Sequence, residues 1–118
     1  MLRKSGLLAL ALAGHAAPLH AEEHYVLMMG AGYFPDVVYP VVGDTVRFVN
    51  SGDAAMMATA TDGSWTTGSL PPEAVYILPV TEGLTQEYTN GLSLESDSFV
   101  SGVIDHANRA PIELENNQ

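Results

Sequence analysis

The sequence predicts an all-β fold, a small sandwich or barrel of about seven strands. Short β-branched and aromatic runs recur between clusters of Gly, Pro, Asp and Asn, which is the pattern of strands joined by turns. Beyond roughly the first two dozen residues, no apolar stripe at helical spacing is long enough to predict a helix. The regular recurrence of these runs over one domain's length of chain therefore favours the all-β class.

The expected strands follow the order of the chain. They are HYVLMM (24–29), VVYPVV (37–42), DTVRFVN (44–50), MMATAT (56–61), VYILPV (75–80), LTQEYT (84–89) and SFVSGVI (98–104). Pro40 and Pro79 interrupt two of them, and a proline cannot donate to a strand ladder. We therefore expect these two runs to lie at sheet edges or to contain bulges.

Alternation along two runs predicts which side chains point inward. In DTVRFVN, Val46, Phe48 and Asn50 share one face, because successive side chains of a strand point to opposite sides. In MMATAT, Met56 shares a face with the two alanines, whereas Met57 shares the other face with the threonines. Met56 is therefore the methionine that we expect to point inward.

The start of the chain has the pattern of a secretory signal peptide. Arg3 and Lys4 form a short basic segment, and the apolar run GLLALALAG that follows is too short to span a bilayer as a helix. Cleavage after Ala21 would leave a small residue before the cut. We therefore expect residues 1–21 to be removed and residues 22–118 to form one periplasmic or secreted domain. The alternative is an uncleaved N-terminal anchor.

The predicted mature domain is strongly acidic. Arg47 and Arg109 are its only Arg or Lys residues against 14 acids, so its net charge is 2 − 14 = −12. Nucleic acid and anionic membranes would be repelled by this charge. The interpretation that we favour is that this charge keeps an exported domain soluble. The alternative is an unidentified partner protein, of which a basic one would fit the charge.

The chain offers no catalytic constellation. It contains no Cys, and its predicted mature part has two His and no Lys. The acids are spread singly along the chain, whereas an enzyme needs a positioned nucleophile or an acid–base pair. We therefore expect a protein that is not an enzyme, and whose stability comes from packing rather than from disulfides.

Two longer segments carry a family resemblance. YFPDVVYPVVGDTVRFVN and MMATATDGSWTTGSLPPEAVYILPVTEG resemble the plastocyanin and pseudoazurin branch of the cupredoxin family, and GDTVRFVN at 43–50 is the most specific piece. The similarity runs from about His24 to Ile104. It implies a Greek-key β-sandwich with an electron-carrying copper ion at one end, held by two His, one Cys and a weak axial Met.

The resemblance also implies where those ligands would stand in this chain. The first His position falls on Met56, the Cys position on Asn90 and the axial Met position on Val100. The second His would follow within 91–98, which contains none, and there is no Cys anywhere in the chain. We therefore expect the type 1 copper site to be lost, so that a copper electron carrier is an alternative that rests on the family resemblance alone.

Met56 has two interpretations. As a structural residue, its flexible thioether would fill the space that a metal and a histidine would occupy. As a ligand, Met56 together with Met57, Met28 or Met29, and His24 would supply soft neutral donors for Cu(I), as in an exported copper carrier. The structural interpretation is favoured, because methionines on strands are ordinary core residues.

His24 also raises the alternative of a Cu(II) site. After cleavage at Ala21 it would be the third residue, so the amine of Glu22, two backbone amides and the imidazole could surround Cu(II) in a square plane. A solvated terminal histidine is the simpler interpretation. His106, in IDHANRAP, is expected to be a surface residue.

Asp44 and Asn50 are predicted to be structural, as a turn former and as a side chain that ties two loops together by hydrogen bonds. The residues together predict an exported, non-catalytic binding or accessory module that needs no cofactor. The alternative is a periplasmic copper-binding protein, with Cu(I) at the methionines or Cu(II) at the new N-terminus.

Overall fold

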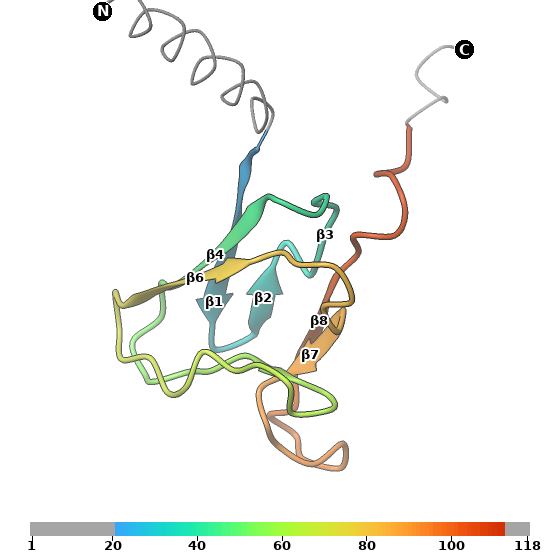
Figure 1. The fold of residues 1–118 in the computed structure, drawn as a ribbon. Helices are drawn as coiled ribbons and strands as arrows, with labels where there is room; N and C mark the ends of the chain where they lie inside the picture. Colours follow the sequence, from blue (N-terminus) through green and yellow to red (C-terminus); the bar gives the residue numbers. More distant parts are fainter. Residues whose placement is uncertain (1–20, 113–118) are drawn as a thin grey trace, which may run out of the picture.

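The computed structural model describes residues 21–112. These residues form eight strands and no helix (Figure 1), and among them nothing resembles a helix able to span a membrane. The strands make two four-stranded sheets, each with parallel and antiparallel pairs. The predicted all-β, sandwich-like class is confirmed. The predicted signal peptide lies outside the described residues except for Ala21.

The first sheet contains the N-terminal strand as an inner member. Its order is β2 (Gly32–Phe34), β1 (Glu23–Met29), β4 (Thr45–Asn50) and β6 (Val75–Pro79). Strands β1 and β4 run parallel, with Glu23 opposite Thr45 and Met28 opposite Asn50. The strand β1 therefore leads from one end of the sheet, at Glu23, to the other end, at Met28.

The second sheet is built from shorter strands. Its order is β3 (Val37–Val38), β8 (Ser101–Ile104), β7 (Glu87–Thr89) and β5 (Thr59–Ala60). The strands β3 and β8 run parallel, and the other pairs are antiparallel. Because the chain passes repeatedly between the sheets from β2 to β7, most neighbouring strands are distant in sequence.

Each of the predicted runs contains a strand, but most strands are shorter than the runs. The strand β3 ends at Val38, before Pro40, and β5 begins only at Thr59, although Met56 forms an isolated bridge. Pro79 ends β6, which is an edge strand as its proline indicated. The strand β2 is not predicted from the sequence, because three residues are too few to show alternation.

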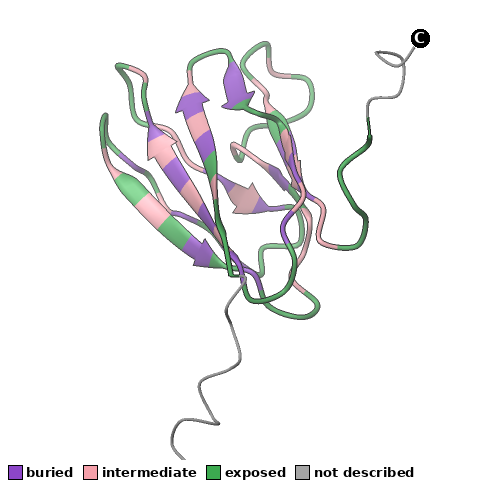
Figure 2. Ribbon diagram, turned by 90° about the horizontal axis from the view of Figure 1, so that it is seen from above, coloured by how far each residue is buried: buried purple, intermediate pink, exposed green. Residues whose placement is uncertain are grey.

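Burial alternates along the longer strands, as Figure 2 shows. Val46, Phe48 and Asn50 are buried, whereas the residues between them are partly exposed. In the MMATAT run, both alanines are buried and Met56 packs against the hydrophobic core, in which Met57 takes no part. The predicted inward direction of Met56 is therefore confirmed.

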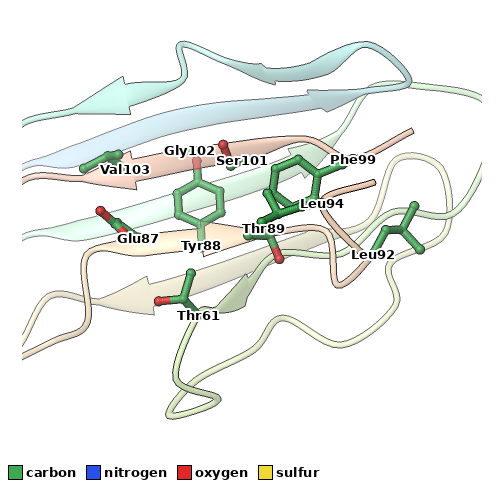
Figure 3. Close-up of a pocket in the computed structure, with 10 residues that line it drawn as sticks. All are labelled: Thr61, Glu87, Tyr88, Thr89, Leu92, Leu94, Phe99, Ser101, Gly102 and Val103. Atoms are coloured by element: carbon green, nitrogen blue, oxygen red, sulfur yellow. The ribbon is translucent and has the colours of Figure 1, made fainter. Parts of the chain in front are cut away.

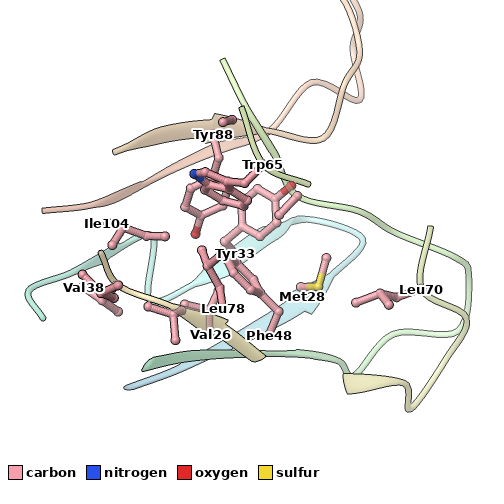
Figure 4. Close-up of a cluster of buried hydrophobic side chains, with 14 residues drawn as sticks. Val26, Met28, Tyr33, Val38, Phe48, Trp65, Leu70, Leu78, Tyr88 and Ile104 are labelled. Atoms are coloured by element: carbon pink, nitrogen blue, oxygen red, sulfur yellow. The ribbon is translucent and has the colours of Figure 1, made fainter. Parts of the chain in front are cut away.

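Four aromatic side chains form the centre of the core (Figure 4). The ring centroid of Tyr88 lies 4.7 Å from that of Tyr33, 5.4 Å from that of Phe48 and 5.7 Å from that of Trp65. Such tilted and edge-on pairs contribute about 1 kcal/mol each beyond their burial. Tyr88, on β7, therefore joins the second sheet to aromatic residues of the first.

Candidate functional site

Met56 and Asn90 lie at the same end of the sandwich, where β7 ends and β8 begins. Together with Met57, Ser69 and Leu92 they line a shallow hollow of about 260 Å³, called here the methionine hollow. Among the described residues, its lining provides two thioethers, a hydroxyl and an amide, but no carboxylate and no imidazole. Its chemistry is therefore that of soft or neutral groups.

Both methionines of the hollow are held by contacts within the protein. The Met56 N–H donates to the Leu70 carbonyl at 3.0 Å, and the Leu70 N–H donates back at 2.7 Å. The Met57 carbonyl accepts the Tyr33 hydroxyl at 2.6 Å, and its sulfur accepts the Thr59 hydroxyl at 3.5 Å. Tyr33 lies on β2, and Met57 lies two residues before β5. The hydrogen bond from Tyr33 to Met57 therefore links the two sheets at this end.

Asn90 fixes both ends of the loop that follows it. Its side-chain N–H donates to the Ser98 carbonyl at 2.8 Å, and its side-chain oxygen accepts the N–H groups of Leu92 and Val100 at 3.3 and 3.4 Å. The Asn90 backbone N–H also donates to the Val100 carbonyl at 3.1 Å. The amide side chain thereby closes residues 91–99 into an anchored loop.

The structure brings together the three positions that the cupredoxin resemblance assigns to copper ligands. Met56 and Asn90 share the methionine hollow, and Val100 is hydrogen-bonded to Asn90 and packs against the core. A type 1 copper ion needs a thiolate and two imidazoles around it. The residues at these positions are a thioether, an amide and an alkyl group, so they do not fit that ion.

His24 lies at the opposite end of β1 from this hollow. Met28 follows four residues later and pairs with Asn50, whose side chain reaches the Leu70 carbonyl beside Met56. At roughly 3.3 Å per residue, four residues of strand span about 13 Å. The structure therefore does not bring His24 together with the methionines of the hollow.

His24 belongs instead to a polar cluster at the start of β1. Its Nε2 atom lies 3.0 Å from Oδ2 of Asp44 and 3.7 Å from Oε1 of Glu22, and one ligand-type atom from each residue lies within 4.8 Å of the others. Asp44, which is only 4% exposed, also accepts the N–H groups of Glu22 at 2.9 Å and Val41 at 3.0 Å. Asp44 therefore ties the start of β1 to the turn before β4.

The surroundings of Asp44 stabilise its charged form. Burial alone would raise the pKa of Asp44, but the N–H groups of Val41 and Glu22, together with His24, outweigh that effect and hold the pKa below its usual value. A carboxyl group whose pKa is lower in the folded state adds stability above its unfolded value, near pH 4. That stability is lost as the pH falls through the folded value.

We therefore expect the wild type to lose more stability between about pH 5 and pH 2 than the variant Asp44→Asn. Thermal unfolding over this range measures the difference. The exposed Asp53 provides the control, because Asp53→Asn should keep the pH dependence of the wild type. Equal slopes for the wild type and Asp44→Asn would show that Asp44 does not make this contribution.

The side chain of Asn50 forms hydrogen bonds with backbone carbonyls of two loops. The side-chain N–H groups of Asn50 donate to the Ala54 and Leu70 carbonyls, each at 2.8 Å. They link the loop after β4 to the loop before β6.

The Nε2 atom of His106 lies 2.7 Å from the Leu84 carbonyl, at the end of the sandwich away from the methionine hollow.

A larger groove, which the sequence did not predict, lies on the outer face of the second sheet and has a volume of about 520 Å³ (Figure 3). Its floor is formed by the outward side chains of β7 and β8, namely Glu87, Thr89, Ser101 and Val103. Its wall is the 91–99 loop, through Leu92, Leu94 and Phe99. We call it the β7–β8 groove. The only signal in the sequence is three large apolar residues within a polar loop.

Two comparisons with known proteins found no match to this chain. No protein-family model matches it, and a search of curated proteins finds no significant match. Function has to be inferred from the methionine hollow, the cluster around Asp44 and the β7–β8 groove.

Proposed function

We propose that residues 22–118 form an exported, cupredoxin-like Greek-key domain that has no type 1 copper site and acts as a non-catalytic binding module. The strand order supports a sandwich, because the chain alternates between two four-stranded sheets from β2 to β7. The segment GDTVRFVN supports it as well, since it supplies the turn before β4 and the inward residues Val46 and Phe48.

The observation that carries this proposal concerns the three positions that the cupredoxin resemblance assigns to copper ligands. Each of them has a side chain that makes contacts within the protein. Met56 packs against the core, and Val100 does the same with an alkyl side chain. The side chain of Asn90 forms hydrogen bonds with Leu92, Ser98 and Val100. A loop that is closed by an amide keeps its shape without a metal ion, so it can serve binding rather than electron transfer.

The partner that suits this domain is a basic protein surface. The predicted mature charge of 2 − 14 = −12 would repel nucleic acid and anionic membranes. The same charge would steer a cationic protein toward the domain and speed their association. No catalytic step is part of the proposal, because the described polar clusters consist of groups that bind one another.

Copper retention tests the proposal. Residues 22–118 are equilibrated with one equivalent of Cu(I) under reducing conditions, or of Cu(II) in air, then desalted and analysed for bound metal. We expect less than about 0.1 copper per chain, because Met56 packs against the core and the Asn90 side chain is hydrogen-bonded within the chain. No visible thiolate–copper band is expected either, because the chain contains no Cys. The variant Met56→Ala should resemble the wild type.

Two other results would count against the proposal. Retention of about one Cu(I) that is lost in Met56→Ala would make the domain a Cu(I) carrier. A redox-active blue species would contradict the assignment altogether.

A second candidate function is metal binding at the cluster of Glu22, His24 and Asp44. The observation in its favour is the spacing of the three ligand-type atoms, which lie within 4.8 Å of one another. Cleavage after Ala21 would add a free amine at Glu22, whose nitrogen lies 2.9 Å from Asp44. Cu(II) accepts such nitrogen and oxygen donors.

The same retention experiment distinguishes the two forms of this candidate. Retained Cu(II) that disappears when one residue is added before Glu22 would assign the metal to the terminal amine. Retained Cu(II) that is lost only in Asp44→Asn would assign it to the side-chain cluster. Absence of retained Cu(II) in the mature chain would eliminate both forms.

A further inference from the structure

The β7–β8 groove has an apolar wall that stands open to solvent. Leu92 and Leu94 are exposed, Leu94 at 79%, and Phe99 is partly buried beside them. All three line the same groove (Figure 3). Large apolar side chains that gather at one place on a soluble domain mark a binding surface more often than scattered ones do. The volume of about 520 Å³ also lies in the range of ligand pockets.

Acidic residues accompany this apolar wall. Glu87 belongs to the floor of the groove, and Glu95 and Asp97 belong to the loop that forms its wall. None of the three forms an ion pair with another residue of the described range. Of the two described arginines, Arg47 pairs with Glu23 on the first sheet, and Arg109 follows β8 in the C-terminal stretch. The groove therefore has one carboxylate without an ion-pair partner, Glu87, in its floor, and the loop that forms its wall carries two more.

The wall of the groove is ordered by the chain itself. Asn90 holds both ends of the loop, as described above. Inside the loop, the Ser96 N–H donates to the Ser93 carbonyl at 2.9 Å, and the Phe99 N–H donates to the Ser96 carbonyl at 3.1 Å. A wall that is formed before binding loses little conformational entropy when a ligand arrives.

We infer that the β7–β8 groove binds a cationic polypeptide segment, that is, an exposed stretch of a partner protein with apolar side chains between Lys or Arg residues. The apolar side chains contact the wall at Leu92 and Leu94, and the basic ones face Glu87 and the acids of the loop. This inference rests on the proposed function of the domain as a binding module, and it names the class of partner.

The chain's own C-terminal segment is a poor occupant of the same groove. Residues 113–118 carry two acids and no base, so Glu87 in the floor and the two acids of the 91–99 loop would repel them. A second copy of the domain is disfavoured for the same reason, because each predicted mature copy has a net charge of 2 − 14 = −12. Charge complementarity therefore selects a basic partner.

Fluorescence anisotropy with a labelled peptide tests the inference. The probe is the peptide KLKFKLK, added to residues 22–118. Two comparison peptides keep its length, one with Ser in place of every Leu and Phe, and one with Glu in place of every Lys. We expect only the peptide KLKFKLK to bind well, and its affinity to fall as salt rises, because screening weakens the attraction between its Lys residues and the acids of the groove floor and the 91–99 loop.

A pair of matched variants locates the binding site. Leu94→Ser removes the most exposed side chain of the wall and should weaken binding of KLKFKLK by about tenfold, the loss expected for one buried leucine. Ile77→Ser removes a side chain that is 44% exposed on the first sheet, and should leave the affinity unchanged. Since Leu94 is mostly exposed, its removal should leave the thermal stability near that of the wild type.

Three results would overturn the inference. They are failure of KLKFKLK to bind, equal binding of the Ser-substituted peptide, and equal affinities of the wild type and Leu94→Ser. The first two would mean that the groove accepts no such segment or that only charge attracts it. A negative peptide result without copper retention would leave the metal-free assignment of the domain intact. Retention of about one Cu(I) that is lost in Met56→Ala would overturn that assignment whatever the peptide does.

Discussion

Replacing Gly102 by alanine is expected to destabilise the domain by about 2–3 kcal/mol, because it overfills a packed core. Gly102 on β8 stands directly opposite Tyr88 on β7. A Cβ atom at this position would overlap the hydroxyl and the ring of Tyr88. That ring has little freedom to move aside, since Tyr33 and Phe48 contact it from two directions. Urea unfolding of Gly102→Ala and of the wild type measures the loss.

Gly30 offers the matched control for this substitution. A Cβ atom at Gly30 would meet no other atom within 4 Å, so Gly30→Ala should change the free energy of unfolding by less than about 0.5 kcal/mol. An unchanged urea midpoint for Gly102→Ala would mean that the Tyr88 side chain does not pack against Gly102.

Asn50→Ala is expected to cost about 3 kcal/mol. Asn50 is fully buried and makes three hydrogen bonds, two donated to the Ala54 and Leu70 carbonyls and one accepted from the Gly52 N–H. Each such bond contributes about 1 kcal/mol, and the buried groups left without a partner add to the loss. Thermal and urea unfolding of the variant measure the effect.

Asn108 allows the same chemical change at an exposed site. Asn108→Ala should stay within about 0.5 kcal/mol of the wild type. If Asn50→Ala were equally mild, Asn50 would not be the residue that links the loops after β4 and before β6, and the geometry of the methionine hollow would rest on other contacts.

The longer strands could be predicted from the sequence because their own alternation encodes burial. The strand β4 is the clearest case, since Val46, Phe48 and Asn50 face inward in the order that their spacing indicates. The strand β2 has only three residues, which form β structure because they pair with β1 rather than through any pattern of their own. The role of Gly102 depends on its register with Tyr88, and register is set by contacts between distant parts of the chain.

Some features of the candidate site could also be predicted from the sequence, whereas others depend on contacts between distant residues. Alternation was enough to predict that Met56 points inward, because that depends only on its neighbours in the strand. The contact of His24 with Asp44 depends on the parallel pairing of β1 with β4, which the sequence does not specify. The β7–β8 groove depends on the direction in which Asn90 turns the 91–99 loop. Such loop geometry leaves no periodic signal in the sequence.

We propose above all that the end of the sandwich around Met56 and Asn90 holds no metal. The most direct test is a two-dimensional ¹H–¹⁵N spectrum of residues 22–118, recorded before and after addition of one equivalent of Cu(I) under reducing conditions. We predict unchanged resonances for Met57, Asn90 and Gly91. Shifts or broadening of these resonances on addition of the one equivalent of Cu(I) would contradict the account.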